Sequence, residues 1–552
     1  MAENDSPVGY IVGESSPQTF SFVTTPNLMP GRLEYLAIRG VTEKIDGHAR
    51  QIDVLAQVTG LGVGSAILGS DLTYEETVAI LRGEYSDRPR VIGEARVIGY
   101  LRDEGEGRKS VRRPRFAAAP GHSVHIAGDT FLQEFFTTGI KHGIEVGHLI
   151  NRSGVRVQLD PNGLRRHLAI IAQTGAGKSY LAGKLLESLV GLGATVLVLD
   201  PNSDYVQIRK VSEHAHTPYQ SARKTSFADR VDLYRVPGVE HHRFSEELVG
   251  DSQPFTVRFA DLTTDEIFDL AGIQERFTRI RGEVQQAVEA LRDDGVDYTP
   301  GELNQRLTQM ARNEENDRQS QDAARGASRY IEPLSRYRIW GQVDFNLNAM
   351  LRPQKVTVID LAGGGRRVVA YVADKALREI WRRALAGQLE HPVFVLLEEA
   401  HTLVPGGRYT TRASSIINTI ASEGRKFRVF LILVTQRPSK IDEEALSQCG
   451  SQIIMQVTNP RDQSAIENAA EALSKELTTD LPGLNRGEAI VIGQLMRVPA
   501  MIAVSGRVSA EGGADIDLVR ELERARRSAE VAQVREENTP AVAAPRGTEP
   551  ML

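Results

Sequence analysis

From the N-terminus to about residue 155, short apolar runs alternate with polar turns. These runs are rich in β-branched residues and are separated by Pro, Gly and Asp, a pattern typical of strands. They cover residues 9–13, 20–23, 51–58 and 90–99. Residues 73–82 differ, because Thr73 and Glu76 have the spacing of a capping box at the start of a helix. Many short strands with regular turns predict a small β-barrel over residues 1–155.

From Leu168 onward, short and fully apolar runs alternate with segments that are long enough for helices. The runs cover residues 168–172, 195–199, 356–359, 393–397 and 429–434. Strands that are buried on both faces have this composition, so the pattern predicts a parallel sheet with crossover helices. We expect this α/β domain to cover residues 156–510.

Two segments depart from the α/β pattern. Within residues 262–338, apolar side chains recur at every third or fourth position across 267–291, which predicts a helical insertion. Towards the C-terminus the chain is first strongly charged and then rich in Pro and Ala. We expect residues 511–552 to form a charged helix over 515–537 followed by a disordered tail.

Composition and charge narrow the class of protein. The chain has 66 Lys and Arg against 72 Asp and Glu, a net charge of −6, so any contact with nucleic acid has to be local. Its single cysteine, Cys449, cannot form an intrachain disulfide. No apolar run approaches the roughly 18 residues of a membrane span, and the acidic N-terminus does not resemble a signal segment. We therefore predict a cytoplasmic protein without a membrane partner.

Residues 172–179, with the sequence AQTGAGKS, form a P-loop directly after a buried strand and directly before a helix. Gly175 and Gly177 allow backbone N–H groups to face a phosphate, Lys178 reaches the β- and γ-oxygens, and Ser179 ligates Mg²⁺. Ala172 stands where the general pattern has its first Gly. The sequence thus predicts binding of ATP with Mg²⁺. The nucleotide-binding candidates are Thr174, Gly175, Ala176, Gly177, Lys178, Ser179 and Tyr180.

A second chemical signal is the apolar strand over 393–397, which ends in Glu398 and Glu399. Two acids at a buried strand end indicate function, because an unpaired buried carboxylate is strongly unfavourable. We expect Glu398 to hold Mg²⁺ together with Ser179, and Glu399 to polarise the attacking water as a general base. His401 is a candidate partner of Glu399.

The strand over 429–434 leads into Gln436, a polar residue that can sense the γ-phosphate and hold the water. The strand over 356–359 also ends in an acid, Asp360, and we expect it to lie between the P-loop strand and the acidic strand. An intervening strand and an added catalytic glutamate are typical of the RecA-like branch of P-loop ATPases. The predicted fold is therefore a RecA-like α/β core of the additional-strand, catalytic-glutamate type, preceded by the barrel.

At these residues the sequence resembles the HerA family of the FtsK/HerA motor superfamily. The resemblance covers most of the chain, although it does not extend to the C-terminal tail. Residues 200–205 are similar to the family's Asp-Pro-His-Gly-Glu-Tyr, with Asn202 and Asp204 in place of the usual His and Glu. The other matching motifs, in the family's order, are residues 7–22, 166–179, 397–401, 423–426 and 435–439.

The resemblance implies a ring-shaped homohexamer that hydrolyses ATP and moves double-stranded DNA through its central pore. It also implies that Arg166 and Arg425 complete the nucleotide site of a neighbouring subunit, where a guanidinium stabilises the transferring phosphoryl group. Family members work with a separate effector. The effector is a NurA nuclease in DNA end resection, or a nuclease or a sirtuin-like NAD-hydrolysing partner in phage defence.

Basic loops are the candidates for contact with DNA. One loop, residues 406–412, offers Arg408 and Arg412, and residues 363–367 offer Arg366 and Arg367. Neither loop has a pattern that reads bases, so we expect contacts to the phosphate backbone. A further basic cluster, residues 108–115, is either a surface loop or a site for an acidic partner or incoming DNA.

Three functions remain open at this point. The first is an ATP-driven DNA translocase or helicase that works with a separate effector. The second is a nucleotide-switched assembly platform that organises an effector docked on the barrel, although the complete set of Lys178, Glu399 and arginines favours turnover. The third is a conjugation or secretion coupling ATPase of the same superfamily, which the lack of a membrane segment disfavours.

Overall fold

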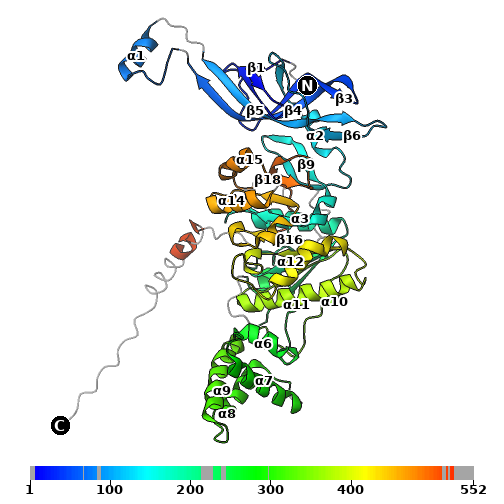
Figure 1. Cartoon of the computed structure of the whole chain (residues 1–552), viewed down its shortest axis with the longest axis vertical. Helices are drawn as coiled ribbons and strands as arrows, with labels where there is room; N and C mark the ends of the chain where they lie inside the picture. Colours follow the sequence, from blue (N-terminus) through cyan, green and yellow to red (C-terminus); the bar gives the residue numbers. More distant parts are fainter. Residues whose placement is uncertain are drawn as a thin grey trace, which may run out of the picture. The chain divides into compact units, whose positions relative to one another are not determined.

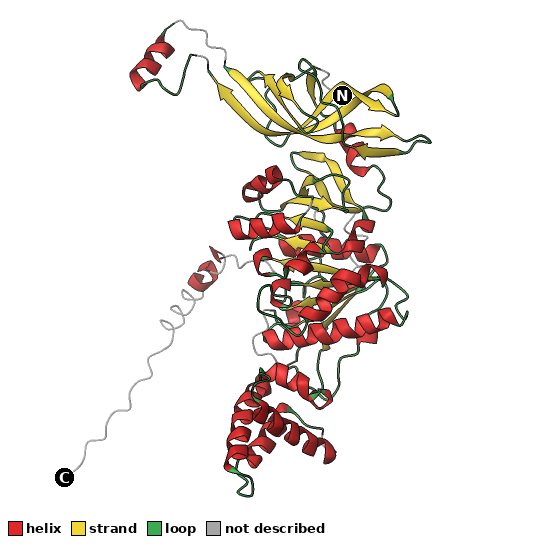
Figure 2. Ribbon diagram, viewed as in Figure 1, coloured by secondary structure: helices red, strands yellow, loops and turns green. Residues whose placement is uncertain are grey.

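The computed structural model describes residues 6–65, 67–83, 89–212, 228–237, 244–295, 297–470, 472–512, 518–519 and 522–527. The chain divides into two units, residues 1–512 and 513–552. In the second unit, residues 518–519 and 522–527 are helical. The rest of the predicted helix over 515–537 and the predicted tail lie outside the described residues. Figures 1 and 2 show the elements of the first unit.

The N-terminal strands form a closed antiparallel barrel. The strand order is β2-β1-β7-β3-β4-β5, and a further pairing between β2 and β5 joins the two ends. Buried side chains such as Phe22, Leu36 and Val54 fill its core. The predicted β-barrel is confirmed. Its strands are β1 (Gly9–Ser15), β2 (Thr19–Thr24), β3 (Tyr35–Ile45), β4 (His48–Gly64), β5 (Arg90–Asp103) and β7 (Ser123–Ile126).

Two short elements extend from the barrel. Strand β6 (Lys109–Arg112) pairs with β5 alone and lies within the basic cluster 108–115. Helix α1 (Tyr74–Arg82) follows β4, and the predicted capping box of Thr73 and Glu76 is formed at its start. The sequence therefore predicted this helix to within one residue.

The second sheet has twelve strands in the order β13-β12-β14-β11-β15-β16-β10-β17-β18-β19-β8-β9. The strands from β13 to β17 run parallel, and the last four are antiparallel. Every residue of the six strands from β14 to β17 in this order is buried, as the fully apolar runs predict. The strands are β8 (Ile144–Leu149), β9 (Arg152–Leu159), β10 (Leu168–Ile171), β11 (Thr195–Asp200), β12 (Val231–Arg235), β13 (Gln253–Pro254), β14 (Val356–Asp360), β15 (Val393–Leu397), β16 (Val429–Thr435), β17 (Ser451–Ile454), β18 (Glu488–Gly493) and β19 (Ala500–Val504).

A strand does separate the P-loop strand from the acidic strand, but it is not the predicted one. Strand β16 pairs with β10 on one side and with β15 on the other. Strand β14, which contains residues 356–359, lies beyond β11 instead. The expectation for residues 356–359 was wrong, because crossover helices allow a strand to enter the sheet far from its neighbours in sequence. The additional-strand fold itself is confirmed.

The first strands of the large sheet precede the P-loop by some twenty residues. Strand β8 pairs with β19, with Ile502 opposite Leu149, and β9 pairs with β8. The predicted domain boundary after residue 155 therefore falls inside β9, and the large sheet begins at Ile144. A run of alternating apolar residues predicts a strand but not the sheet that it joins, which explains the difference.

Helices accompany the large sheet, and a helical group lies between β13 and β14 within the predicted insertion. This group buries Val284, Leu303 and Ala327 in a shared apolar core. The insertion helices are α6 (Thr264–Ala271), α7 (Thr278–Asp293), α8 (Pro300–Met310) and α9 (Arg318–Ile331). The others are α2 (Asp129–Thr137), α3 (Lys178–Gly191), α5 (Glu246–Val249), α10 (Leu347–Met350), α11 (Arg366–Leu385), α12 (Ser414–Glu423), α13 (Glu443–Ser447), α14 (Pro460–Ala469) and α15 (Lys475–Asp480). Among the described helices, none is both long and apolar enough to cross a membrane.

The segment after β19, residues 505–512, is tied to α3. The carboxylate of Glu187 on α3 accepts a hydrogen bond from the backbone N–H of Val508 at 3.0 Å. The fully buried guanidinium of Arg507 donates to the carbonyl of Ser179 at 2.7 Å. This segment therefore holds the helix that begins at the P-loop.

Candidate functional site

The P-loop connects β10 to α3 with the backbone that its glycines predict. Gly175 and Gly177 have φ angles of 81° and 107°, which side chains of L-residues rarely adopt. A Cβ atom on Gly177 would also lie 3.2 Å from the side chain of Met455. Gly177 caps α3 without any side-chain hydrogen bond, so the first N–H groups of the helix remain available to an anion.

Lys178, the first residue of α3, contacts both carboxylates that follow β15. Its ammonium donates to Oε1 of Glu398 and, at 3.0 Å, to Oε1 of Glu399. Burial alone would lower the pKa of Lys178, but the two adjacent carboxylates raise it above its usual value. The lysine is therefore a buried cation that two anions hold at the P-loop.

Glu398 is fully buried, and a tyrosine satisfies its second oxygen. The hydroxyl of Tyr205 donates to Glu398 Oε2 at 2.7 Å. Burial, and then the charge of Glu398, raise the pKa of Tyr205 well above its usual value, so the phenol keeps its proton and remains a donor. Sequence reasoning assigned no role to Tyr205, although it ends the motif of residues 200–205.

Glu399 adopts the left-handed backbone conformation, with φ of 51°, which is rare for a residue with a side chain. Its Oε1 accepts a hydrogen bond from Gln436 Nε2 at 2.8 Å, and Gln436 in turn accepts one from Thr174 Oγ1 at 2.5 Å. Burial raises the pKa of Glu399, while the charge of Lys178 opposes this shift. The structure thus brings the predicted base, the predicted polar sensor and the P-loop together.

The other oxygen of Glu399 faces His401. The distance from His401 Nδ1 to Glu399 Oε2 is 3.2 Å, but this oxygen is buried without an aligned hydrogen bond in the described chain. The same ring nitrogen lies 3.1 Å from Thr435 Oγ1, with which it shares a hydrogen bond. His401 therefore lies beside Glu399, as the sequence suggested, and Thr435 is a contact that sequence reasoning missed.

Ser179 lies next to the acidic loop that follows β11. Its hydroxyl donates to Asp204 Oδ2 at 3.4 Å. The carboxylate of Asp200 accepts the backbone N–H groups of Asp204 and Tyr205 at 3.0 and 2.8 Å and so shapes the loop. Burial, followed by the charges of Asp204 and Asp360, raises the pKa of Asp200 well above its usual range. Asp204 is placed at the P-loop although it replaces the family's usual glutamate.

The oxygen atoms beside the P-loop suit a magnesium ion that binds together with the phosphates of a nucleotide. Ser179, Glu398 and Asp204 supply hydroxyl and carboxylate oxygens, which are the ligands that Mg²⁺ prefers. Within the described residues, no group of three or more His, Cys, Asp or Glu could hold a metal ion. These oxygens therefore fit an ion that keeps phosphate and water ligands, as Mg²⁺ usually does in nucleotide sites.

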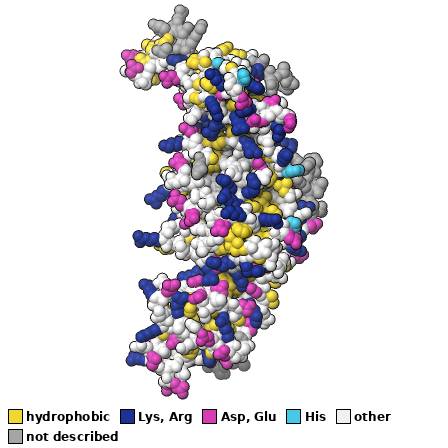
Figure 3. All heavy atoms as spheres, turned by 45° about the vertical axis from the view of Figure 1, so that its right-hand side comes forward, with side chains coloured by type: hydrophobic (Ala, Val, Ile, Leu, Met, Phe, Trp, Pro, Cys, Tyr) yellow, Lys and Arg dark blue, Asp and Glu magenta, His cyan; other side chains and the backbone are white. Residues whose placement is uncertain are grey.

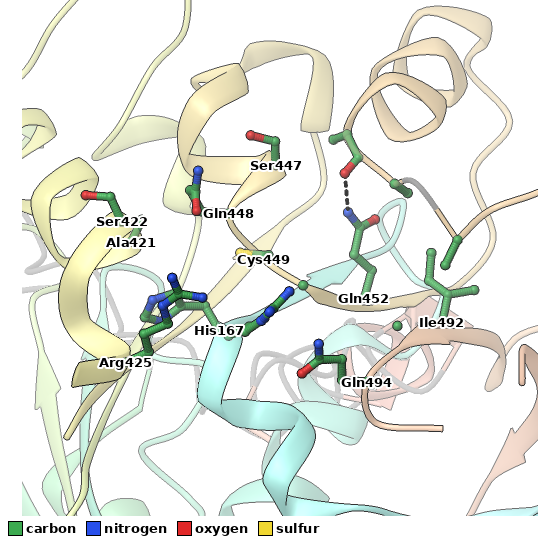
Figure 4. A pocket seen from close by; sticks show the side chains of 16 residues that line it. His167, Ala421, Ser422, Arg425, Ser447, Gln448, Cys449, Gln452, Ile492 and Gln494 are labelled. Atoms are coloured by element: carbon green, nitrogen blue, oxygen red, sulfur yellow. Dashed lines mark hydrogen bonds between the residues drawn. The ribbon is translucent and has the colours of Figure 1, made fainter. Parts of the chain in front are cut away.

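Arg166 and Arg425 lie at the opposite edge of the sheet from the P-loop. Arg166 precedes β10 and Arg425 precedes β16, whereas the P-loop and Gln436 follow the other ends of these strands. Both arginines are exposed and line one pocket of about 320 Å³. Figure 4 shows Arg425 beside the ring of His167 in this pocket. The structure brings the two predicted arginines together and separates them from Lys178 of their own chain.

The two basic loops differ in the surroundings of their arginines. Arg412 is held by carboxylates, at 2.8 Å from Asp374 and 2.6 Å from Asp269, so its charge is already matched within the chain, and its contact with DNA stays a prediction. Arg366 and Arg367, by contrast, are exposed at the start of α11. On the face drawn in Figure 3, Lys and Arg side chains gather in local groups.

The basic cluster in the barrel is largely neutralised on the surface. Arg108 pairs with Glu106 at 2.9 Å, and Arg112 pairs with Glu104 at 3.0 Å. These exposed pairs contribute little to stability. Most of the positive charge that the sequence shows here is thus matched by neighbouring acids, which favours the interpretation as a solvated surface.

Known proteins resemble this chain along most of its length. Residues 144–380, which begin with β8 and include the P-loop, match the family described as Helicase HerA, central domain. A probable helicase of Methanocaldococcus jannaschii is 28% identical over 533 residues, which are 94% of this chain and 94% of the relative. The DNA double-strand break repair helicase HerA of Pyrococcus furiosus is 28% identical over 554 residues, covering 90% of this chain and 92% of the relative.

Among solved structures, the plasmid coupling protein TrwB in complex with ADP and Mg²⁺ is similar, with a TM-score of 0.46 and 13% identity. The alignment covers 70% of this chain and 94% of that protein. The central family match and the relatives that span nine tenths of the chain confirm the resemblance that the motifs suggested. Over most of its length, this chain is therefore similar to helicases of the HerA family.

Proposed function

We propose that this protein is an ATPase that uses hydrolysis to move or unwind double-stranded DNA. The observation that carries the proposal is the cluster at the P-loop, in which Lys178 and Gln436 both hold Glu399. A general base, a cation for phosphate oxygens and a polar sensor are the groups that phosphoryl transfer to water requires. The relatives that are named as helicases support the same activity.

The residues divide the chemistry among them. The P-loop N–H groups and the ammonium of Lys178 bind phosphate oxygens, and Lys178 then exchanges a carboxylate partner for a phosphate. Glu399 accepts a proton from the attacking water at a carboxylate oxygen, and the amide of Gln436 orients that water. Ser179 and Glu398 would hold Mg²⁺, with Asp204 beside them, and the ion would neutralise charge on the phosphates.

We also propose that the working form is a homohexamer in which each nucleotide lies between two subunits. Arg166 and Arg425 support this arrangement, because both lie at the edge of the sheet away from their own P-loop. An arginine supplied by a neighbour can contribute about 10³–10⁵ in rate. A central pore for double-stranded DNA follows from such a ring.

The cellular role that we propose is DNA end processing with a separate nuclease as the effector. Several relatives are named as DNA double-strand break repair helicases, which supports this role over phage defence. A NurA-like nuclease is the effector that the family resemblance suggests for repair. A sirtuin-like or nuclease partner remains the prediction for a defence role.

The decisive experiment is steady-state ATP hydrolysis by the purified protein, with and without long linear double-stranded DNA. We expect turnover that DNA stimulates and that Lys178→Ala abolishes. Lys141→Ala, which removes an exposed lysine outside the P-loop, is the control and should behave as the wild type. Normal turnover in Lys178→Ala would show that the P-loop does not bind the nucleotide.

A further inference from the structure

A large basic cavity opens at the same edge of the sheet as the P-loop. It has a volume of about 1160 Å³ and lies between α6 and the segments that follow β14, β15, β16 and β17. This volume exceeds the roughly 300–1000 Å³ of ordinary small-molecule pockets. Six cationic side chains line the cavity against one carboxylate, that of Asp269. The cations are Arg366, Arg367, Arg412, Arg437, Lys440 and Arg461.

Most of these cations have no anion to balance them. Arg412 is held by Asp269 and Asp374, but the other five are exposed, and none of them forms an ion pair within the described part of the chain. Several unbalanced cations around one cavity create a positive potential that concentrates anions. In a chain with net charge −6, this local excess is unusual and indicates a polyanionic ligand.

The cavity also offers an aromatic side chain at its rim. Tyr409 lines it and is 79% exposed, on the loop that carries Arg408. Exposed aromatic and arginine side chains in a positively charged groove are typical of proteins that bind nucleic acids without reading sequence. A phosphodiester backbone fits the size, the charge and the lining of the cavity better than a compact anion does.

His401 connects this cavity to the catalytic glutamate. Its ring lines the cavity, while Nδ1 lies 3.1 Å from Thr435 Oγ1 and 3.2 Å from Glu399 Oε2. Thr435 has the hydrogen bond, and the glutamate oxygen is left buried without one in the described chain. A small rotation of the ring would exchange these two partners, so the residue has two closely related positions.

The cations of the cavity act on His401 through space. Burial, then Arg437, Lys178, Arg366 and Lys440 in that order, lower the pKa of His401 to about 4. Arg437 also lowers the pKa of Glu399, although burial dominates there and raises it. Three of these cations line the cavity, so a phosphate bound among them would change the field at both residues.

We infer that this cavity binds the phosphate backbone of a nucleic acid and that His401 is a positioning residue, which turns from Thr435 to Glu399 when the cavity is filled. The ring then supplies the missing hydrogen bond to Glu399 Oε2 and holds the base for the attacking water. This inference rests on the proposed function, because it requires Glu399 to be the general base. It explains how DNA would accelerate hydrolysis without touching the nucleotide.

The first test compares His401→Leu with His401→Asn in the full-length protein. The measurement is ATP turnover with and without linear double-stranded DNA, separated into kcat and KM for ATP. We expect DNA to raise kcat of the wild type at least about fivefold, a usual size for coupling between sites. His401→Leu should lower this ratio to about one and leave KM within about twofold. His401→Asn, whose Nδ2 can replace Nδ1, should keep at least about half of the stimulation.

The second test removes cations from the cavity. In Arg366→Gln/Lys440→Gln, the DNA concentration for half-maximal stimulation should rise at least about tenfold, and the salt dependence of binding should weaken by about one for each lost phosphate contact. Fluorescence anisotropy with labelled DNA measures the affinity directly. The matched control, Arg312→Gln/Arg336→Gln, removes two exposed arginines of the insertion that do not line the cavity and should leave both values unchanged.

Each other outcome would overturn a specific part of the inference or the proposed function. Full DNA stimulation in His401→Leu would overturn the role of His401, and so would a wild type that turns over ATP without responding to DNA. Unchanged DNA affinity in Arg366→Gln/Lys440→Gln would overturn the cavity as the binding site. Equal stimulation by inorganic polyphosphate would overturn nucleic acid as the ligand. Absence of any ATP turnover in the wild type would instead refute the proposed function on which the inference rests.

Discussion

The site around Lys178 and the pocket of Arg166 and Arg425, at opposite edges of the large sheet, differ in how their charged residues are balanced. At the edge where the parallel strands end, Lys178 is buried between Glu398 and Glu399, and its charge is matched within the chain. At the edge where they begin, Arg166 and Arg425 are exposed, and neither forms an ion pair with a described residue. Buried charges are paired within the chain, whereas charges that bind another molecule have to remain exposed. This difference is the basis of the proposal that one subunit carries two half-sites, which meet only between neighbouring subunits.

The largest expected effect tests this separation. Arg425→Ala should lower turnover by about 10³-fold or more while nucleotide binding stays intact, because the arginine lies away from its own P-loop. Mixing this variant with Lys178→Ala should restore part of the activity, since an intact P-loop then meets an intact arginine. Turnover is measured against the mixing ratio, with the exposed neighbour Lys426→Ala as control. Failure of the mixture to recover any activity would contradict a site shared between subunits.

A smaller effect distinguishes the roles of the two glutamates that follow β15, Glu398 and Glu399. Glu399→Gln should bind ATP but hydrolyse it at least about 100-fold more slowly, because an amide cannot accept the proton of the water. Glu398→Gln should weaken the dependence on Mg²⁺, since Glu398 is the proposed ligand of the ion and contacts Lys178 and Tyr205 rather than Gln436. Turnover and nucleotide affinity are measured for both variants. A nearly normal rate in Glu399→Gln would move the base to Glu398 or Asp204.

The pH dependence of hydrolysis tests whether Glu399 is the general base. Burial raises the pKa of Glu399, and the base acts only when deprotonated, so kcat/KM should begin to fall at a higher pH than an ordinary glutamate would allow. Below that pKa the fall should approach about tenfold per pH unit. His401 does not titrate there, because burial and nearby cations lower its pKa to about 4. The profile is measured at saturating Mg²⁺, and an identical acid limb in Glu399→Gln would exclude Glu399 as its source.

The smallest effect concerns stability and compares two arginines of one loop. Arg412→Gln should reduce the free energy of unfolding by about 1–2 kcal/mol, because buried Asp374 loses one of its two arginine partners. Arg408→Gln, in an exposed position, should change it by less than about 0.5 kcal/mol. Denaturant unfolding of both variants measures the difference. Equal stabilities would mean that the ion pairs of Arg412 do not contribute.

Sequence and structure agree best where a function depends on adjacent residues. The P-loop, the glutamates after β15 and the polar residue after β16 are set by short-range spacing, and the fold brings them together. The order of the strands in the sheet was not predicted correctly. Strand β16 lies between β10 and β15 because long crossover segments bring it there, and the apolar pattern does not specify their path. The same holds for β8 and β9, whose sequences do not show that β8 pairs with β19 and that β9 pairs with β8.

Individual side chains were harder to predict when their partners are distant. The ion pairs of Arg412 involve Asp269, Asp374 and Glu266, residues 38 to 146 positions away in the chain. Tyr205 is 193 positions from the glutamate that it contacts. Nothing in the local sequence of either residue distinguishes these roles from a solvated arginine or a core tyrosine. The charge pattern therefore located the basic loops but could not show which of their arginines already form ion pairs within the chain.

The attachment of residues 505–512 to α3 determines where the chain can be shortened. A truncation after Val504 would keep all strands of the large sheet but remove Arg507 from the Ser179 carbonyl and Val508 from Glu187. A truncation after Gly512 would keep both contacts. The first protein should retain its sheet and lose affinity for ATP, and the second should bind ATP as the full chain does. On this expectation, the shortest chain that binds nucleotide extends eight residues beyond the last strand, from Val504 to Gly512.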